Sequence, residues 1–149
     1  MNQKFMQAAL QQAKLAAALG EVPVGAVVVQ GGRVIAAAHN LVETNCDPTA
    51  HAEVLAIRAA CKALNTFRLE KASLYVTLEP CPMCAGAAAN ARMAEVVFGA
   101  GDPAKGALGG ALNLFYYRLP NKPQVYGGVL EQECLALLQD FFKAVRGKK

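Results

Sequence analysis

Hydrophobic and polar positions follow two different periods along this chain. Apolar residues recur at helical spacing over residues 2–19, which end before Gly20, and again over residues 131–145. A short β-branched run over residues 24–29 is typical of a buried strand. Because Gln30-Gly31-Gly32 follows this run and a second apolar run follows the glycines, we predict a hairpin.

Between these segments the pattern continues to alternate between the two periods. Proline and glycine mark the borders, and proline fits the first turn of a helix. The expected elements are strands over 33–38, 73–78, 94–99 and 125–129, a helix that is entered through 47–49 and ends near 64, a helix over 81–91 and a short helix over 112–117. Alternating helices and strands predict an α/β fold with a three-layer α/β/α architecture around a mixed sheet. No linker or repeat divides residues 1–149, so we expect a single domain.

Composition places the chain among ordinary globular proteins. It has 149 residues, of which 54% are hydrophobic and 17% charged, enough to bury a core. We find no long apolar span and no signal-peptide pattern, and therefore expect no membrane insertion. Five cysteines without the spacing of a disulfide framework are typical of a reducing compartment, so we predict a cytoplasmic location.

The most informative residues are His51-Ala52-Glu53 and Pro80-Cys81-Pro82-Met83-Cys84. Together they offer three ligands of the type that zinc prefers and one carboxylate that is not needed as a ligand. A structural zinc site uses four protein ligands, whereas a catalytic site leaves one position for water. The count therefore indicates a hydrolytic enzyme in which a metal activates water and Glu53 moves the proton.

Two other interpretations of the cysteine pair explain less. A redox Cys-x-x-Cys pair leaves His51 and Glu53 without a role, and a four-cysteine zinc site needs a second close pair, whereas the other cysteines stand alone. Both ligand groups fall at predicted helix starts, where the helix dipole favours thiolates. The neighbouring Glu79 precedes the turn at Pro80, and we expect it to be structural.

Positive charge gathers at the C-terminal end of a chain whose net charge is +4. After Asp140 there is no acidic residue, and the bases that follow are Lys143, Arg146, Lys148 and Lys149. A basic helix end could bind phosphates, but the helix dipole also favours cations at this position. Charge alone leaves both interpretations open.

Two motifs resemble the zinc-dependent cytidine deaminase superfamily: PTAHAE at residues 48–53 and LYVTLEPCPMCAG at residues 74–86. Within this superfamily the chain looks like the bacterial tRNA-specific adenosine deaminases. Three further segments are similar to that group, namely GEVPVGA at 20–26, VVFGA at 96–100 and DFFK at 140–143. The resemblance covers nearly the whole chain and is weakest at the two ends and over residues 114–123.

The resemblance implies a cytidine deaminase-like fold and a homodimer that converts adenosine to inosine at the wobble position of a tRNA anticodon, acting on a flipped-out base. It implies that His51, Cys81 and Cys84 bind Zn²⁺ and that Glu53 is the proton shuttle. It also implies a set of substrate contacts, which are Asn40, Val24, Pro80, Asp102, Phe141, Phe142 and Arg146. Two of these contacts compete with structural roles, because Asp102 could be a turn residue before Pro103 and at least one of the two phenylalanines is expected to face the core.

One stretch departs from the family pattern. Many relatives carry histidine before the last strand, in a segment that contributes to substrate contact, whereas this chain reads Pro120-Asn121-Lys122-Pro123. A deaminase of a free base or nucleoside on the same scaffold therefore remains an alternative to the tRNA anticodon stem-loop. A zinc-stabilised RNA-binding module without catalysis is less favoured, because Glu53 would then have no task.

Overall fold

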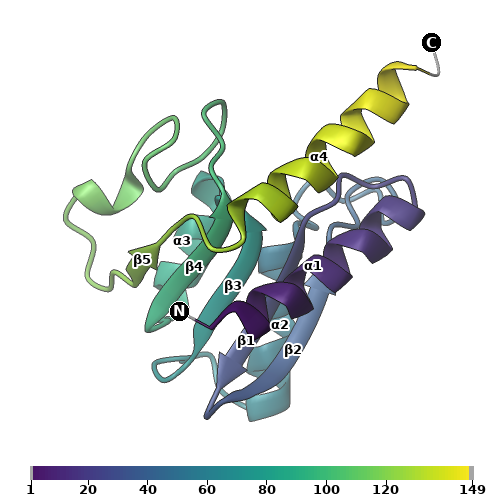
Figure 1. Cartoon of the computed structure of the whole chain (residues 1–149). Helices are drawn as coiled ribbons and strands as arrows, with labels where there is room; N and C mark the ends of the chain where they lie inside the picture. The colour runs from purple at the N-terminus through teal and green to yellow at the C-terminus, as the bar shows by residue number, and fades with distance from the viewer. Residues whose placement is uncertain (1, 148–149) are drawn as a thin grey trace.

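A computed structural model describes residues 2–147 of the chain (Figure 1). Helices and strands alternate along most of it. The elements are α1 (Gln3–Ala18), β1 (Gly25–Gln30), β2 (Arg33–His39), α2 (Ala52–Leu64), β3 (Ser73–Leu78), α3 (Pro82–Asn90), β4 (Glu95–Ala100), the 3-10 turn η1 (Leu114–Tyr116), β5 (Gln124–Tyr126) and α4 (Glu131–Arg146). Within the described residues, no helix combines the length and apolar character that crossing a membrane requires.

The strands form one mixed sheet in the order β2-β1-β3-β4-β5. Strand β1 is antiparallel to both of its neighbours, whereas β3, β4 and β5 run parallel to one another. Helices α1 and α4 lie against one face of the sheet, and α2 and α3 lie together on the other (Figure 1). The predicted three-layer α/β class is confirmed.

Burial on both faces explains why β1 reads as a continuous apolar run. Its residues from Gly25 to Val29 are all buried, because α1 covers one face and α2 the other. Gly25 lies so close to α1 that an added Cβ would collide with the backbone of Ala9 and Ala13. The central strand is thus fixed between two helices.

The predicted hairpin is present between β1 and β2. Gln30 pairs with Arg33, and the two residues between them, Gly31 and Gly32, have φ of +62° and +72°. Positive φ at both positions is what a two-residue turn matching the strand twist requires, and glycine adopts it without strain. The turn chemistry read from the sequence sets the pairing next to the turn, and the register shifts by one residue between Val28 and Val29, farther along the strands.

Two predicted elements are shorter in the structure than in the sequence analysis. The expected helix over 112–117 is only the 3-10 turn Leu114–Tyr116, and the expected strand over 125–129 is Gln124–Tyr126. The strand ends early because Gly127 passes over the ring of Phe98, so closely that an added Cβ would lie 2.5 Å from its Cζ atom. The next residue, Gly128, turns away with φ of +87°.

Strands β2 and β3 finish at the same edge of the sheet. After His39 the chain runs through a loop into α2, and after Leu78 it turns directly into α3. Both helices therefore begin at the same edge, with their N-termini close together. The loop that follows β4 leaves the sheet at the same edge.

Candidate active site

Three potential metal ligands meet at the starts of α2 and α3. His51 is the N-cap of α2, Cys81 is the N-cap of α3, and Cys84 lies in the first turn of α3. The Nδ1 atom of His51 lies 3.6 Å from Sγ of Cys81 and 3.4 Å from Sγ of Cys84. All three ligand atoms lie within 4.8 Å of one another, so the group could hold a metal ion.

Glu53 lies beside these ligands in the first turn of α2. Two residues on one continuous helix would point in different directions, but His51 has an extended backbone, with φ −74° and ψ 150°, and precedes the helix. Both side chains therefore line the same cavity. Glu53 is only 4% exposed, and its burial raises its pKa to about 7, against the opposing hydrogen bond from its backbone and the charge of His51. A carboxyl group that titrates near neutrality can both accept and donate a proton.

The thiols of the two cysteines differ in pKa. A hydrogen bond from Cys84 lowers the pKa of the Cys81 thiol to about 4, with further help from His51. The same hydrogen bond, together with burial, raises the pKa of Cys84. The lowered pKa of Cys81 favours its thiolate, and a cation between the two sulfur atoms would favour the thiolate form of both.

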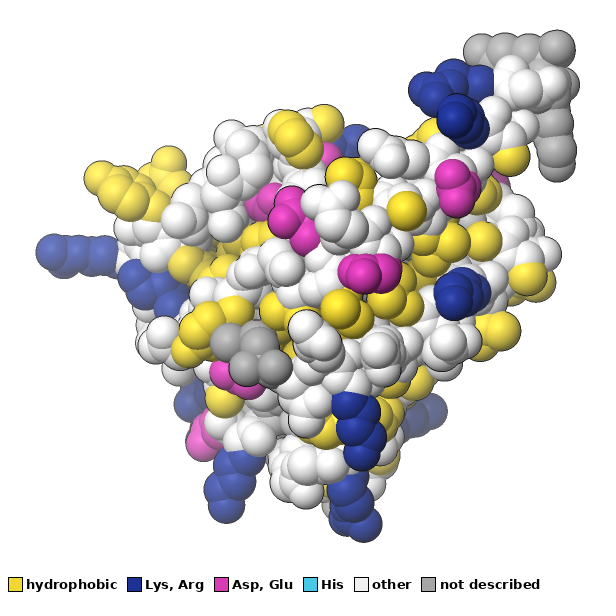
Figure 2. Space-filling model, viewed as in Figure 1, with side chains coloured by type: hydrophobic (Ala, Val, Ile, Leu, Met, Phe, Trp, Pro, Cys, Tyr) yellow, Lys and Arg dark blue, Asp and Glu magenta, His cyan; other side chains and the backbone are white. Residues whose placement is uncertain are grey.

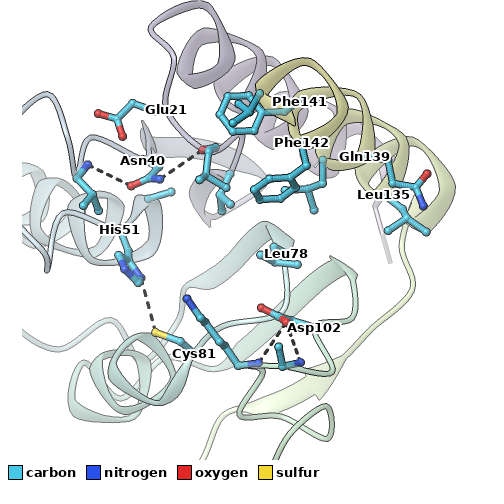
Figure 3. Close-up of a pocket in the computed structure, with 18 of the residues that line it drawn as sticks. Glu21, Asn40, His51, Leu78, Cys81, Asp102, Leu135, Gln139, Phe141 and Phe142 are labelled. Atoms are coloured by element: carbon cyan, nitrogen blue, oxygen red, sulfur yellow. Dashed lines mark hydrogen bonds between the residues drawn. The ribbon is translucent and has the colours of Figure 1, made fainter. Parts of the chain in front are cut away.

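A cavity of about 1340 Å³ opens over this group. Ligand pockets for small molecules occupy roughly 300–1,000 Å³, so this one has room for more than a single base. Figure 3 shows His51 and Cys81 on one side of the cavity and residues of α4 across from them. The predicted substrate contacts that line it are Val24, Asn40, Asp102, Phe141, Phe142 and Arg146. Pro80 is buried beneath the surface instead, where its carbonyl oxygen accepts a hydrogen bond from the backbone N–H of Ala107.

Asn40 and Asp102 also have partners within the protein. The side-chain amide of Asn40 donates to the carbonyl of Val22 and accepts from the backbone N–H of Val42, at 3.4 and 3.2 Å (Figure 3). Oδ1 of Asp102 accepts from the backbone N–H groups of Ala104 and Lys105, at 3.1 and 3.2 Å. The turn role that we considered for Asp102 is thus present, and contact of either residue with substrate stays a prediction.

Helix α4 forms the far wall of the cavity and projects beyond the body of the protein (Figure 1). Phe141 is half-buried and Phe142 is 44% exposed, and their rings pack edge to face. The buried residues of α4 are Cys134 and Leu138, nearer its start, because only the first turns cover the sheet. Cationic side chains gather at its projecting end (Figure 2), while Lys148 and Lys149 lie outside the described residues.

Comparison with known proteins assigns the chain to a family. The MafB19-like deaminase family model matches residues 1–146. A tRNA-specific adenosine deaminase of Bacillus subtilis is 52% identical over 149 residues, which cover 99% of this chain and 92% of the relative. The chain belongs to the tRNA-specific adenosine deaminase family.

Solved structures agree with this assignment. One of them comes from work on A-to-I editing by tRNA:A34 deaminases at the wobble position of transfer RNA. It matches this deaminase with a TM-score of 0.85 and 44% sequence identity, and the match covers 92% of this chain and 100% of that chain. A guanine deaminase of Bacillus subtilis has 45% identity but a TM-score of 0.64, and the match covers 68% of this chain and 66% of that one. Similarity to the guanine deaminase thus extends over less of the chain.

The stretch that departs from the family pattern lies away from the cavity of this deaminase. Among the described residues that line the cavity, none belongs to residues 120–123. Nζ of Lys122 instead donates to the carbonyl groups of Phe115 and Tyr117, each at 3.2 Å. The stretch therefore supports the loop around η1 and not the walls of the cavity.

A buried carboxylate that the sequence analysis missed shapes one wall of the site. Glu21 is 2% exposed and accepts hydrogen bonds from the backbone N–H groups of Glu43 and Thr44 and from the Thr44 hydroxyl. Burial alone would raise its pKa, but the hydrogen bonds from Thr44 and Glu43 outweigh burial and hold the pKa below the usual 4.5. The only signal in the sequence was its place in the segment 20–26 that resembles the family.

This pKa shift predicts how acid affects the stability of the deaminase. Because the folded state lowers the pKa of Glu21, its stabilising contribution is present above about pH 4.5 and is lost as the pH falls further. We expect Glu21→Gln to be less stable than wild type at neutral pH and the two free energies of unfolding to converge in acid. Urea denaturation across this pH range measures the difference, with Glu43→Gln, an exposed carboxylate nearby, as the control. Parallel curves for wild type and Glu21→Gln would contradict the assignment.

Proposed function

We propose that this protein is a zinc-dependent hydrolase that converts adenosine to inosine at the wobble position of a tRNA anticodon. The observation that carries the proposal is the three-ligand group with the buried Glu53 beside it, in a chain that belongs to the tRNA-specific adenosine deaminase family. A carboxylate that is not needed as a ligand is what hydrolysis requires in addition to the metal.

The donor set fits Zn²⁺. Zinc–sulfur bonds of about 2.3 Å and zinc–nitrogen bonds of about 2.0–2.1 Å at tetrahedral angles put nitrogen and sulfur roughly 3.5 Å apart. The separations between His51 Nδ1 and the sulfur atoms of Cys81 and Cys84 are 3.6 and 3.4 Å. One imidazole and two thiolates leave the fourth tetrahedral position for water, which is the arrangement of a catalytic site.

The chemistry then divides between the metal and Glu53. A zinc ion bound there would lower the pKa of a water molecule toward neutrality. Glu53 would accept a proton from this water and deliver it to the ring nitrogen of adenine next to the carbon under attack. It would then take the proton of the hydroxyl group added at that carbon and transfer it to the departing amine, so that adenosine and water give inosine and ammonia. The burial that raises the pKa of Glu53 to about 7 suits a group that changes protonation twice in each turnover.

The walls of the cavity favour an RNA substrate. Three of the residues that line it, Lys105, Lys143 and Arg146, carry positive charge and can meet phosphates. The exposed ring of Phe142 offers a surface on which an unpaired base can stack. A free base would need neither the cations nor the length of α4.

The substrate is tested by direct comparison of RNA with small molecules. An adenosine-34 anticodon stem-loop should yield inosine, whereas free adenosine, adenine, guanine and cytosine should remain unchanged. Glu53→Ala should bind zinc as wild type does and lose turnover by roughly a hundred- to ten-thousandfold. Rapid turnover of a free base with the stem-loop untouched would favour the guanine deaminase-like alternative, and RNA binding without product would favour a binding module.

The metal is tested by removing one ligand. Purified protein should contain about one equivalent of zinc. Cys84→Ala should weaken zinc binding by more than the roughly 10–100-fold typical of losing a residue that only hydrogen-bonds to a metal ligand. Its melting temperature should fall as well, because metal binding supports the fold. Cys61→Ala removes a half-buried thiol elsewhere on α2 and serves as the control. Full zinc occupancy in Cys84→Ala would contradict the ligand assignment.

The compartment follows from the cysteines. All five lie within the described residues and are free thiols, including exposed Cys46. Two of them are the proposed thiolate ligands, which oxidation would remove. We therefore propose a cytoplasmic location, where thiols stay reduced.

A homodimer is a further part of the proposal. Helix α3 buries Cys84, Ala85, Ala88 and Ala89, whereas Met83 on its other side is 37% exposed and open space surrounds Gly86. The neighbouring η1 segment exposes Tyr116 and Tyr117, at 83% and 63%. An apolar helix face with small residues, flanked by exposed aromatic side chains, is suited to close packing against a second copy.

The proposed interface predicts the effect of charge on association. Sedimentation should show a dimer at micromolar concentration, and Tyr116→Lys combined with Tyr117→Lys should shift it toward monomer. Phe67→Lys is the matched control, because Phe67 is 67% exposed but belongs to the loop after α2. A monomeric wild type, or a dimer that the tyrosine substitutions leave intact, would exclude this interface.

A further inference from the structure

We propose that Glu79 is a positioning residue for deamination, which fixes one wall of the substrate cavity through its buried carboxylate. The wall concerned is the segment 101–110 after β4, called the wall loop below. The role in deamination rests on the proposed function, whereas the anchoring of the loop can be measured independently.

The carboxylate of Glu79 binds both ends of the wall loop. Its Oε1 atom accepts a hydrogen bond from the backbone N–H of Asp102 at 2.9 Å. Its Oε2 atom accepts from the N–H groups of Leu108 and Gly110, at 2.9 and 2.8 Å. Glu79 is only 4% exposed, so these N–H groups replace the water that an anion needs.

The wall loop is wound closely around this carboxylate. An added Cβ at Gly106 would collide with the carboxyl group of Glu79, and one at Gly110 would lie 2.6 Å from Oε1. Side chains at these two positions would therefore push the loop away from its anchor. Glycine at both positions gives the loop backbone the close approach that the three hydrogen bonds require.

The anchored segment faces the substrate cavity. Asp102 and Lys105 line the cavity, together with Gly101 and Ala104. Asp102 continues the anchoring, because its own side chain accepts from the backbone N–H of Lys105. Lys105 and His51 line the same cavity. Glu79 thus holds the segment that carries Lys105 on the cavity wall, where the phosphates next to a flipped-out base would pass.

Glu79 acts on the loop and not on the metal ligands. It precedes Cys81 by two residues, but the hydrogen bonds of its side chain all go to the wall loop. Loss of this carboxylate should therefore weaken the binding of RNA while leaving the ligand group and Glu53 in place. A purely structural residue would lower stability without separating KM from kcat.

Glu79→Gln is the first test, because it keeps the size of the side chain and removes its charge. With the adenosine-34 stem-loop we expect KM to rise roughly tenfold while kcat stays within about threefold. Zinc content should remain about one equivalent. Hydrogen exchange of the Asp102, Leu108 and Gly110 amides should accelerate, whereas the Thr44 amide, which Glu21 holds, should exchange as in wild type.

Gly106→Ala is the second test, because it disturbs the same contact from the loop side and leaves Glu79 intact. It should raise KM in the same way, and it keeps the proposal testable if Glu79→Gln folds poorly. Glu95→Gln is the control for loss of a carboxylate, since Glu95 lies on β4 and its carboxylate accepts from the Ser73 hydroxyl. This variant should match wild type in KM.

Three results would overturn the proposal. A fall in kcat together with lost zinc would place the role of Glu79 at the metal ligands. Faster exchange with unchanged KM would show that the anchored loop has no part in substrate binding, and unchanged exchange would show that Glu79 does not anchor it. A wild type that leaves the stem-loop unconverted would end the proposed function instead, and the exchange measurement would still decide whether Glu79 anchors the loop.

Discussion

The direction of β1 between β2 and β3 is the constraint on which the site depends. Because β1 is antiparallel to both neighbours, β2 and β3 run the same way and finish at the same edge of the sheet. Each is followed on the same face by a helix, α2 and α3 respectively, and these helices must start close together. The proposed ligands His51 and Cys81 are the N-caps of these two helices. Strand order therefore brings these two helix starts to the same edge of the sheet.

Three buried glutamates line the cavity. Their hydrogen-bond partners distinguish the two that hold loops from the one that is proposed to transfer protons. Glu21 and Glu79 accept hydrogen bonds from backbone N–H groups of the loops that they hold, which keeps both carboxylates fixed. No loop is bound to Glu53 in this way among the described residues, and its burial raises its pKa to about 7 beside Cys84. Glu21 and Glu79 are thus tied to loops, whereas the raised pKa of Glu53 suits its proposed part in proton transfer.

The sequence was most informative where structure follows from neighbouring residues. Gly31 and Gly32 predicted the hairpin turn because its backbone needs positive φ, and the ligand motifs predicted their own place at helix starts. Long-range contacts could not be derived in this way. Glu79 was expected to be structural because of the adjacent Pro80, but its partners Leu108 and Gly110 are about thirty residues away, and nothing in the local pattern points to them. The early end of β5 could not be predicted for the same reason, because it involves the ring of Phe98 in another strand.

The ligand group and the walls of the cavity carry different information about substrate. One imidazole, two thiolates and a buried carboxylate suit hydrolytic deamination of any base that reaches them, so they cannot separate tRNA from guanine. The walls of the cavity can distinguish these two substrates, because a flipped-out nucleotide brings its phosphates and neighbouring bases with it. Lys105 on one side and the projecting end of α4 with Phe142 and Arg146 on the other provide charge and an aromatic surface beyond the space of a single base. Residues 120–123 line neither wall, so the proposed basis for RNA selection does not depend on them.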